Sequence, residues 1–176
     1  LLMNILGIIP ARYASSRFPG KPLVDINGRS MILRVYDQAL LSEVFREVIV
    51  ATDDERIFNH VADAGYQAVM TSVAHRSGTD RCLEAAEIRE QMLGKNFDHV
   101  INIQGDEPFI HPEQIRKVAA VLTSSGAPIA TLAKLITSHE EIYNPNVVKV
   151  VFGKNMDALY FSRSPVPYLR DVRETQ

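Results

Sequence analysis

Apolar runs alternate with segments of helical spacing along most of the chain. Short apolar runs at residues 5–9, 46–52, 67–71 and 98–104 are expected as buried strands. Between them apolar residues recur three and four positions apart, as Ile57, Val61 and Ala64 do. Strands that alternate with helices predict parallel βαβ units. We therefore expect an α/β fold with a Rossmann-like, mostly parallel sheet flanked by helices.

Start and stop signals refine the expected helices. Ser30 is a candidate N-cap for a helix that ends near residue 40, and Pro112 suits the first turn of another helix. Beyond that helix, residues 128–133 are expected as one more strand. Residues 147–152 and 158–161 flank a Gly-Lys-Asn turn, which predicts a small β-hairpin excursion.

The composition of the chain mainly excludes certain kinds of partner and site. The 176-residue chain carries a net charge of −2, which gives no basic footprint for nucleic acid. Its single cysteine, Cys82, allows no disulfide framework or thiolate metal site and is expected in the core; a reducing cytoplasm is the simplest compartment. No apolar run approaches the roughly 18 residues of a membrane span. The chain ends in the polar stretch 173–176, with no helix or strand after it. We therefore expect the C-terminal part of the domain to be missing or not shown.

The first polar loop carries the densest positive charge. Arg12, Arg17 and Lys21 follow the first expected strand and stand among prolines. Open α/β sheets bind ligands at that end of their strands, and Arg forks with a Lys point charge suit a triphosphate. The loop is not a Walker A motif, because Ser15 stands where a glycine is needed and Pro22 follows the lysine. A solvated surface loop is the alternative.

Asp106 is the second candidate. It follows the strand at 98–104 in a Gly-Asp-Glu-Pro turn, where a short carboxylate can hold a hard cation such as Mg²⁺ beside phosphates. The alternative is an aspartate that only caps a turn.

Three further groups remain open on residue chemistry alone. The loop at 75–81 is either a helix entry capped by Ser77 or Thr79, or a ligand site built from backbone N–H groups. Arg163, at the end of the last expected strand, is either a carboxylate clamp or an ordinary edge cation. The Asp53-Asp54 pair is typical of metal-dependent glycosyltransferases, but helix capping is the preferred interpretation.

Five ordered motifs resemble one family. PARYASSRFPGKPL (10–23), HRSGTDR (75–81), NIQGDEPFI (102–110), NPNVVKVV (144–151) and ALYFSRSPVP (158–167) are together similar to the CMP-Kdo synthetases, the 3-deoxy-manno-octulosonate cytidylyltransferases. The resemblance covers essentially the whole chain. It implies a fold of the nucleotide-diphospho-sugar transferase type, with residues 1–176 as a single nucleotidyltransferase domain in a homodimer.

The resemblance also implies roles for individual residues. Arg12, Lys21 and Asp106 would be catalytic, with Asp106 as a Mg²⁺ ligand, and Gln104 and Arg163 would meet the sugar. The nucleotide would be bound by Ala11, Arg12, Ser15, Ser16, Arg17, Lys21, Thr71, Ser72, His75, Ser77, Gly78, Thr79, Arg81 and Gln104.

The implied reaction is attack by the anomeric hydroxyl of Kdo on the α-phosphorus of CTP, which releases pyrophosphate. It would serve lipopolysaccharide biosynthesis. No side chain is an evident general base, and a metal-assisted deprotonation makes one unnecessary. Two alternatives stay open: a CMP-sialate or other sugar nucleotidyltransferase, and a non-catalytic CTP-binding module.

Overall fold

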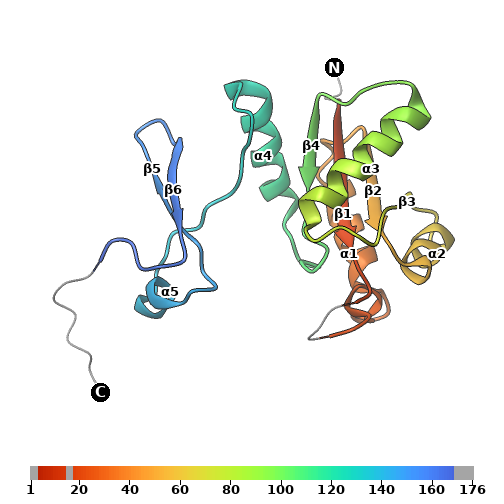
Figure 1. The fold of residues 1–176 in the computed structure, drawn as a ribbon, viewed down its shortest axis with the longest axis horizontal. Coiled ribbons are helices and arrows are strands. Elements are labelled where there is room, and N and C mark those ends of the chain that lie inside the picture. The colour runs from red at the N-terminus through yellow and green to blue at the C-terminus, as the bar shows by residue number, and fades with distance from the viewer. Residues whose placement is uncertain (1–3, 15–17, 169–176) are drawn as a thin grey trace. The chain divides into compact units, whose positions relative to one another are not determined.

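Four parallel strands form the central sheet in the computed structural model, which describes residues 4–14 and 18–168. They are β1 (Ile5–Ala11), β2 (Glu47–Thr52), β3 (Ala68–Met70) and β4 (His99–Asn102), in the order β3-β2-β1-β4 (Figure 1). All three pairings are parallel. The α/β fold expected from the sequence is confirmed.

Both faces of the sheet are covered by helices. On one face lie α1 (Met31–Leu40), α2 (Glu55–Asp63) and α4 (Pro112–Ser125), whose apolar side chains join one core cluster with Ile5, Ile9 and Ile101. The other face is covered by α3 (Gly78–Leu93), which packs on Leu6 and Ile8 (Figure 1). Successive residues of β1 therefore face opposite cores, and complete burial of each large side chain contributes about 1.5–3 kcal/mol.

The helix starts follow the sequence signals in part. Asp54 caps α2 by accepting from the Arg56 N–H at 3.0 Å, and Ser77 caps α3 in the same way from the Asp80 N–H at 3.1 Å. Ser30 stands at the N-cap position of α1, but its hydroxyl pairs with the Nε2 of His60 at 2.7 Å instead of a backbone N–H.

Residues 131–176 form a second compact unit, separate from residues 1–130, and each unit is described by itself. The second unit contains α5 (His139–Tyr143) and an antiparallel pair, β5 (Lys149–Phe152) and β6 (Ala158–Ser162), as the hairpin pattern predicted. The strand expected at residues 128–133 is wrong, since these residues are irregular and pair with no strand. An extended segment is stabilised only when it pairs with a neighbouring strand, and no strand of the described residues pairs with this apolar run. Ile129 is 84% exposed.

Two further features complete the fold. A single turn of 3₁₀ helix, η1 (Lys21–Leu23), ends the basic loop (residues 10–23) and leads toward α1. None of the helices within residues 4–14 and 18–168 has both the length and the hydrophobicity that crossing a membrane requires.

Candidate active site at the carboxyl edge of the sheet

The strand order places two loops at one reversal point of the sheet. From β1 the chain proceeds to β2 and β3 on one side, and it returns to β4 on the other side. Ligands of open α/β sheets bind where the order reverses, outside the carboxyl ends of the strands. The basic loop follows β1, and the turn that carries Asp106 follows β4. Both candidates therefore lie at the expected position for a ligand.

Pro10, near the end of β1, brings the surrounding segments close together. A Cβ added to Gly105 would lie 2.8 Å from the Pro10 carbonyl oxygen, and one added to Gly78 would lie 3.4 Å from the Pro10 ring. Only glycine fits the first position without displacing the backbone. The turn before Asp106 and the start of α3 thus both pack against the last residues of β1.

The basic loop is closed by its own backbone. The N–H of Gly20 donates to the Tyr13 carbonyl at 2.9 Å, and Gly20 has a left-handed φ of 74°, which favours glycine. The Arg56 guanidinium stacks on the Tyr13 ring at 3.3 Å from its centroid. Ser15, Ser16 and Arg17, expected at the nucleotide, lie outside the described residues.

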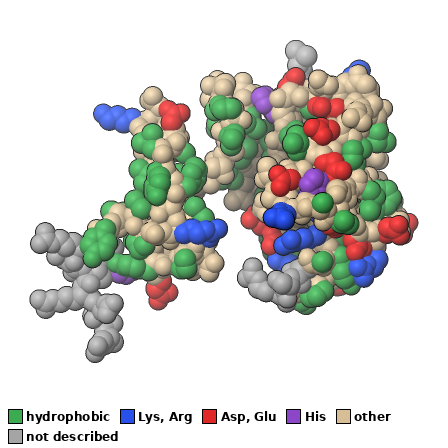
Figure 2. Space-filling view, in the orientation of Figure 1, with side chains coloured by type: hydrophobic (Ala, Val, Ile, Leu, Met, Phe, Trp, Pro, Cys, Tyr) green, Lys and Arg blue, Asp and Glu red, His purple; other side chains and the backbone are tan. Residues whose placement is uncertain are grey.

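Lys21 and Asp106, which are 85 positions apart in sequence, are in direct contact. The Lys21 ammonium donates to a carboxylate oxygen of Asp106 at 2.8 Å, and the two side chains are 37% and 55% exposed. An exposed pair of this kind holds the fold only weakly, so the lysine can exchange the carboxylate for a phosphate. Arg12, just after β1, is exposed and pairs with no side chain of the described residues. Figure 2 shows Lys and Arg side chains gathered at this edge.

The donor set at Asp106 fits a magnesium ion that arrives with a nucleotide. Mg²⁺ is commonly held by one or two carboxylates and takes its other ligands from phosphates and water. The described part of the chain contains no group of three or more His, Cys, Asp or Glu side chains that could cage an ion without them. A single exposed carboxylate beside the basic loop is the kind of ligand that such an ion takes from a protein.

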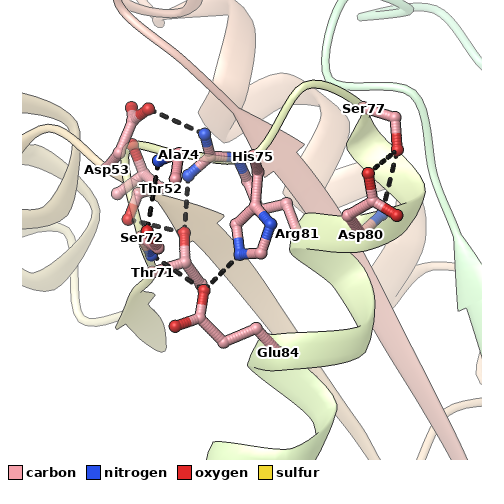
Figure 3. Close-up of polar contacts among 10 residues, drawn as sticks. All are labelled: Thr52, Asp53, Thr71, Ser72, Ala74, His75, Ser77, Asp80, Arg81 and Glu84. Atoms are coloured by element: carbon pink, nitrogen blue, oxygen red, sulfur yellow. Dashed lines mark hydrogen bonds and ion pairs between the residues drawn. The ribbon is translucent and has the colours of Figure 1, made fainter.

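Arg81 fastens the ends of three elements together. Its side chain is 4% exposed; Nη1 donates to the Thr71 hydroxyl, and Nη2 donates to Asp53 at 2.7 Å (Figure 3). The Thr71 N–H donates in turn to the Thr52 carbonyl at 2.8 Å. Arg81 and Thr71, both expected at the nucleotide, are thus already bonded within the protein, and they join the ends of β2 and β3 to α3.

The His75 loop, residues 71–77, is fastened to the same helix. One carboxylate oxygen of Glu84 accepts from the Ser72 N–H at 2.8 Å and pairs with the Nε2 of His75 (Figure 3). These two contacts, the N–H first, lower the pKa of the Glu84 carboxyl below its ordinary value. Sequence reasoning missed Glu84, because nothing in the pattern of α3 indicates a partner in the preceding loop.

Other predicted residues form the open rim of the site. Ser77, Gly78 and Thr79 are exposed at the start of α3, and Gln104 is exposed just after β4. Cys82 is 5% exposed beneath them, and burial raises the pKa of its thiol to about 12. The expectation that Cys82 belongs to the core is confirmed.

Arg163 lies in the second unit. It follows β6, is exposed, and donates from Nη1 to the Pro145 carbonyl at 2.9 Å. The neighbouring Lys149 is 3% exposed, and its ammonium donates to the carbonyls of Asn144, Val147 and Arg163. Lys149 therefore anchors the backbone that carries Arg163, a role that the apolar pattern around it concealed.

Comparison with known proteins decides the family. Residues 6–175 match the family model described as cytidylyltransferase. The 3-deoxy-manno-octulosonate cytidylyltransferase of Parabacteroides distasonis is 52% identical over 179 residues, which cover 99% of this chain and 69% of that protein. The same enzyme of Cytophaga hutchinsonii is 54% identical, over 96% of this chain and 65% of that protein. The chain belongs to the CMP-Kdo synthetase family.

A solved structure supports the same assignment. A CMP:2-keto-3-deoxy-manno-octonic acid synthetase complexed with CTP superposes with a TM-score of 0.83 at 46% identity, over 95% of this chain and 67% of that one. A cytidylyltransferase from Leptospira borgpetersenii, 22% identical with a TM-score of 0.58 over 70% of this chain and 51% of that one, shares the fold alone. The chain spans about two thirds of the length of the CMP-Kdo synthetases it matches.

Proposed function

We propose that this protein transfers CMP from CTP to the anomeric hydroxyl of Kdo and releases pyrophosphate. The observation that carries the proposal is the contact between Lys21 and Asp106 at the reversal point of the sheet. A lysine that would bind phosphate and an aspartate that would bind the metal meet there, in a chain about half identical to enzymes named for this reaction.

The triphosphate of CTP would lie along the basic loop. Arg12 is exposed, and the Lys21 side chain is 37% exposed where it pairs with the carboxylate. We assign both, with Arg17, to the phosphate oxygens. When CTP enters, the Lys21 ammonium would leave Asp106 for a phosphate. Charge that develops on the phosphates during displacement would then be stabilised by cations already in place.

Asp106 would bind the magnesium ion of the nucleotide. When bound, Mg²⁺ supplies charge neutralisation at the phosphates and favours the ionised form of the attacking hydroxyl. The protein's own contribution is a carboxylate held in place by the glycine turn, whose Gly105 packs against the Pro10 carbonyl. No general base is required of the side chains in this scheme.

The base and the sugar would be bound by the remaining predicted residues. We assign the cytosine to the His75 loop and the start of α3, and the junction of nucleotide and sugar to Gln104. Arg163 would bind the Kdo carboxylate as a bidentate donor. The residues assigned to the nucleotide, in addition to Arg12, Arg17, Lys21 and Gln104, are Ala11, Ser15, Ser16, Thr71, Ser72, His75, Ser77, Gly78, Thr79 and Arg81.

We further infer a cytoplasmic homodimer in which residues 1–176 belong to one nucleotidyltransferase domain serving lipopolysaccharide biosynthesis. Exposed apolar side chains on β6 support an assembly, since Leu159 is 68% and Phe161 52% exposed. Sedimentation would measure the mass of the particle. A monomer at micromolar concentration would contradict this part of the proposal.

The test is pyrophosphate release from CTP, Kdo and Mg²⁺, with each component omitted in turn. Release that requires all three supports the proposal. A sialic acid arm distinguishes the related sugar transfer, and CTP binding without turnover would indicate a binding module instead. Replacement of Arg163 by Ala should impair Kdo use more than CTP binding, and equal impairment of both would remove it from the sugar site.

A further inference from the structure

The middle of the His75 loop is held by very few contacts. Its first residue, Thr71, is bonded to β2, and its last residue, Ser77, caps α3. Between them Val73 is 79% exposed, so no apolar anchor holds the loop against the core. Ser72 also accepts from the Ala74 N–H at 3.1 Å, but this contact lies within the loop itself. Order in this segment depends on a bond from elsewhere.

Glu84 supplies that bond. The same carboxylate oxygen contacts both the backbone N–H of Ser72 and the Nε2 of His75, which are twelve and nine positions away. Glu84 lies on α3, and the helix is itself anchored by the buried Arg81 (Figure 3). The loop is therefore tied, through one oxygen atom, to a rigid element.

The pairing also sets the chemistry of the histidine ring. An ionised carboxylate only accepts hydrogen bonds, so Nε2–H of His75 donates to Glu84 and Nδ1 is the ring nitrogen left over. Nδ1 makes no hydrogen bond with the residues that the structure describes. The ring is thus held in one position with Nδ1 left for a ligand, while Glu84 itself is occupied.

We propose that Glu84 is a positioning residue, which holds the His75 loop in the conformation that receives the nucleotide base. This inference rests on the proposed function, because it takes the loop to be the base-binding segment. It adds a residue that contacts no substrate and acts through Ser72 and His75.

The experiment is calorimetric titration of CTP with Mg²⁺ into the whole chain and its variants, without Kdo. Glu84→Ala removes both contacts and should weaken CTP binding about tenfold, or 1.4 kcal/mol. Glu84→Gln keeps an amide oxygen that can accept from both donors, so binding should stay within about threefold of the unaltered chain. Glu87→Ala is the matched control, since Glu87 is exposed one turn away on the same helix. This variant should bind CTP as the unaltered chain does.

Each outcome decides one question. Unchanged CTP binding by a folded Glu84→Ala variant would overturn the positioning role, and so would equal losses in Glu84→Ala and Glu84→Gln. If the unaltered chain binds no CTP, the proposed function fails and this inference fails with it. Should Glu84→Ala not fold, as seen by circular dichroism, Glu84→Asp shortens the reach of the carboxylate instead and should weaken CTP binding without loss of folding.

Discussion

The basic loop and the His75 loop lie at the same edge of the sheet, yet their charged side chains have different partners. Among the side chains that the structure describes, exposed Arg12 pairs with none and Lys21 pairs only with Asp106, in a contact more than a third exposed on each side. In the His75 loop region, Arg81 is 4% exposed and bonded to Asp53 and Thr71, while Glu84 binds two groups of the loop. One set of charges is available to a ligand, and the other is used within the protein.

The difference follows from what each region is proposed to bind. A triphosphate carries several negative charges, and cations that are exposed and weakly paired can transfer to it with little loss of stability. A nucleobase is neutral and must be recognised by shape and by individual hydrogen bonds, so its loop needs to be fixed beforehand. Substitutions in the basic loop region should therefore change activity with little change in stability. Those behind the His75 loop should change stability and, through the position of the loop, the binding of CTP.

The largest effect expected is on stability, from Arg81→Met. The substitution leaves Asp53 without its buried partner, and breaking such a pair costs about 3 kcal/mol. Urea unfolding measures the loss. Arg56→Met is the control, because the Arg56 side chain is 59% exposed where it pairs with Asp54, against 4% for Arg81, and its loss should cost about 1 kcal/mol or less. Equal losses of unfolding free energy in the two variants would contradict the structural role assigned to Arg81.

The next effect is on turnover, from Asp106→Asn. Loss of the carboxylate charge at the proposed metal site should lower the rate of pyrophosphate release at saturating CTP by roughly 10² or more. The free energy of unfolding should change little, because the pair with Lys21 is exposed. Glu107→Gln removes the neighbouring exposed carboxylate and should leave turnover nearly unchanged. Near-normal turnover in Asp106→Asn would exclude Asp106 from the mechanism.

The sequence predicted the basic loop and Asp106 better than it predicted the contacts behind the His75 loop. Lys21 and Asp106 each follow a strand, and parallel strands end at one edge, so topology alone brings their loops together. The strand order and the direct pairing of Lys21 with Asp106 were not predicted from the sequence and are seen only in the structure. The motifs added the family, and with it the roles proposed for these residues.

The contacts behind the His75 loop depend on geometry that no pattern encodes. Arg81 and Glu84 are three positions apart on one helix face, but their partners belong to β2 and to the preceding loop. Apolar patterning likewise reports the tendency to be buried, not the presence of a neighbouring strand. It therefore gave the wrong result at residues 128–133.

Gly105→Ala should have an intermediate effect, on stability and on turnover. The new Cβ would lie 2.8 Å from the Pro10 carbonyl oxygen, and the backbone shift that relieves this clash should cost about 2 kcal/mol. Turnover should fall as well, since Asp106 is the next residue. Thermal unfolding and pyrophosphate release measure the two losses. Gly153→Ala is the control, because its nearest neighbour would be at an ordinary 3.9 Å; equal melting temperatures for both variants would contradict the close contact.

The smallest effect expected is the pH dependence of stability that Glu84 confers. The Ser72 N–H and His75 lower the folded-state pKa of Glu84 below 4.5, whereas the unfolded chain keeps the ordinary value. The ionised carboxylate therefore stabilises the folded state fully above pH 4.5, and this contribution is lost as the pH falls through the folded-state pKa. Glu84→Gln cannot titrate, so the stability difference between the unaltered chain and this variant should be largest near neutral pH and should shrink in acid. Urea unfolding at a series of pH values measures that difference, and Glu87→Gln provides the baseline on the same helix. A difference that is constant from pH 7 to pH 3 would show that the charge of Glu84 contributes nothing to holding the loop, and that its two contacts act through geometry alone.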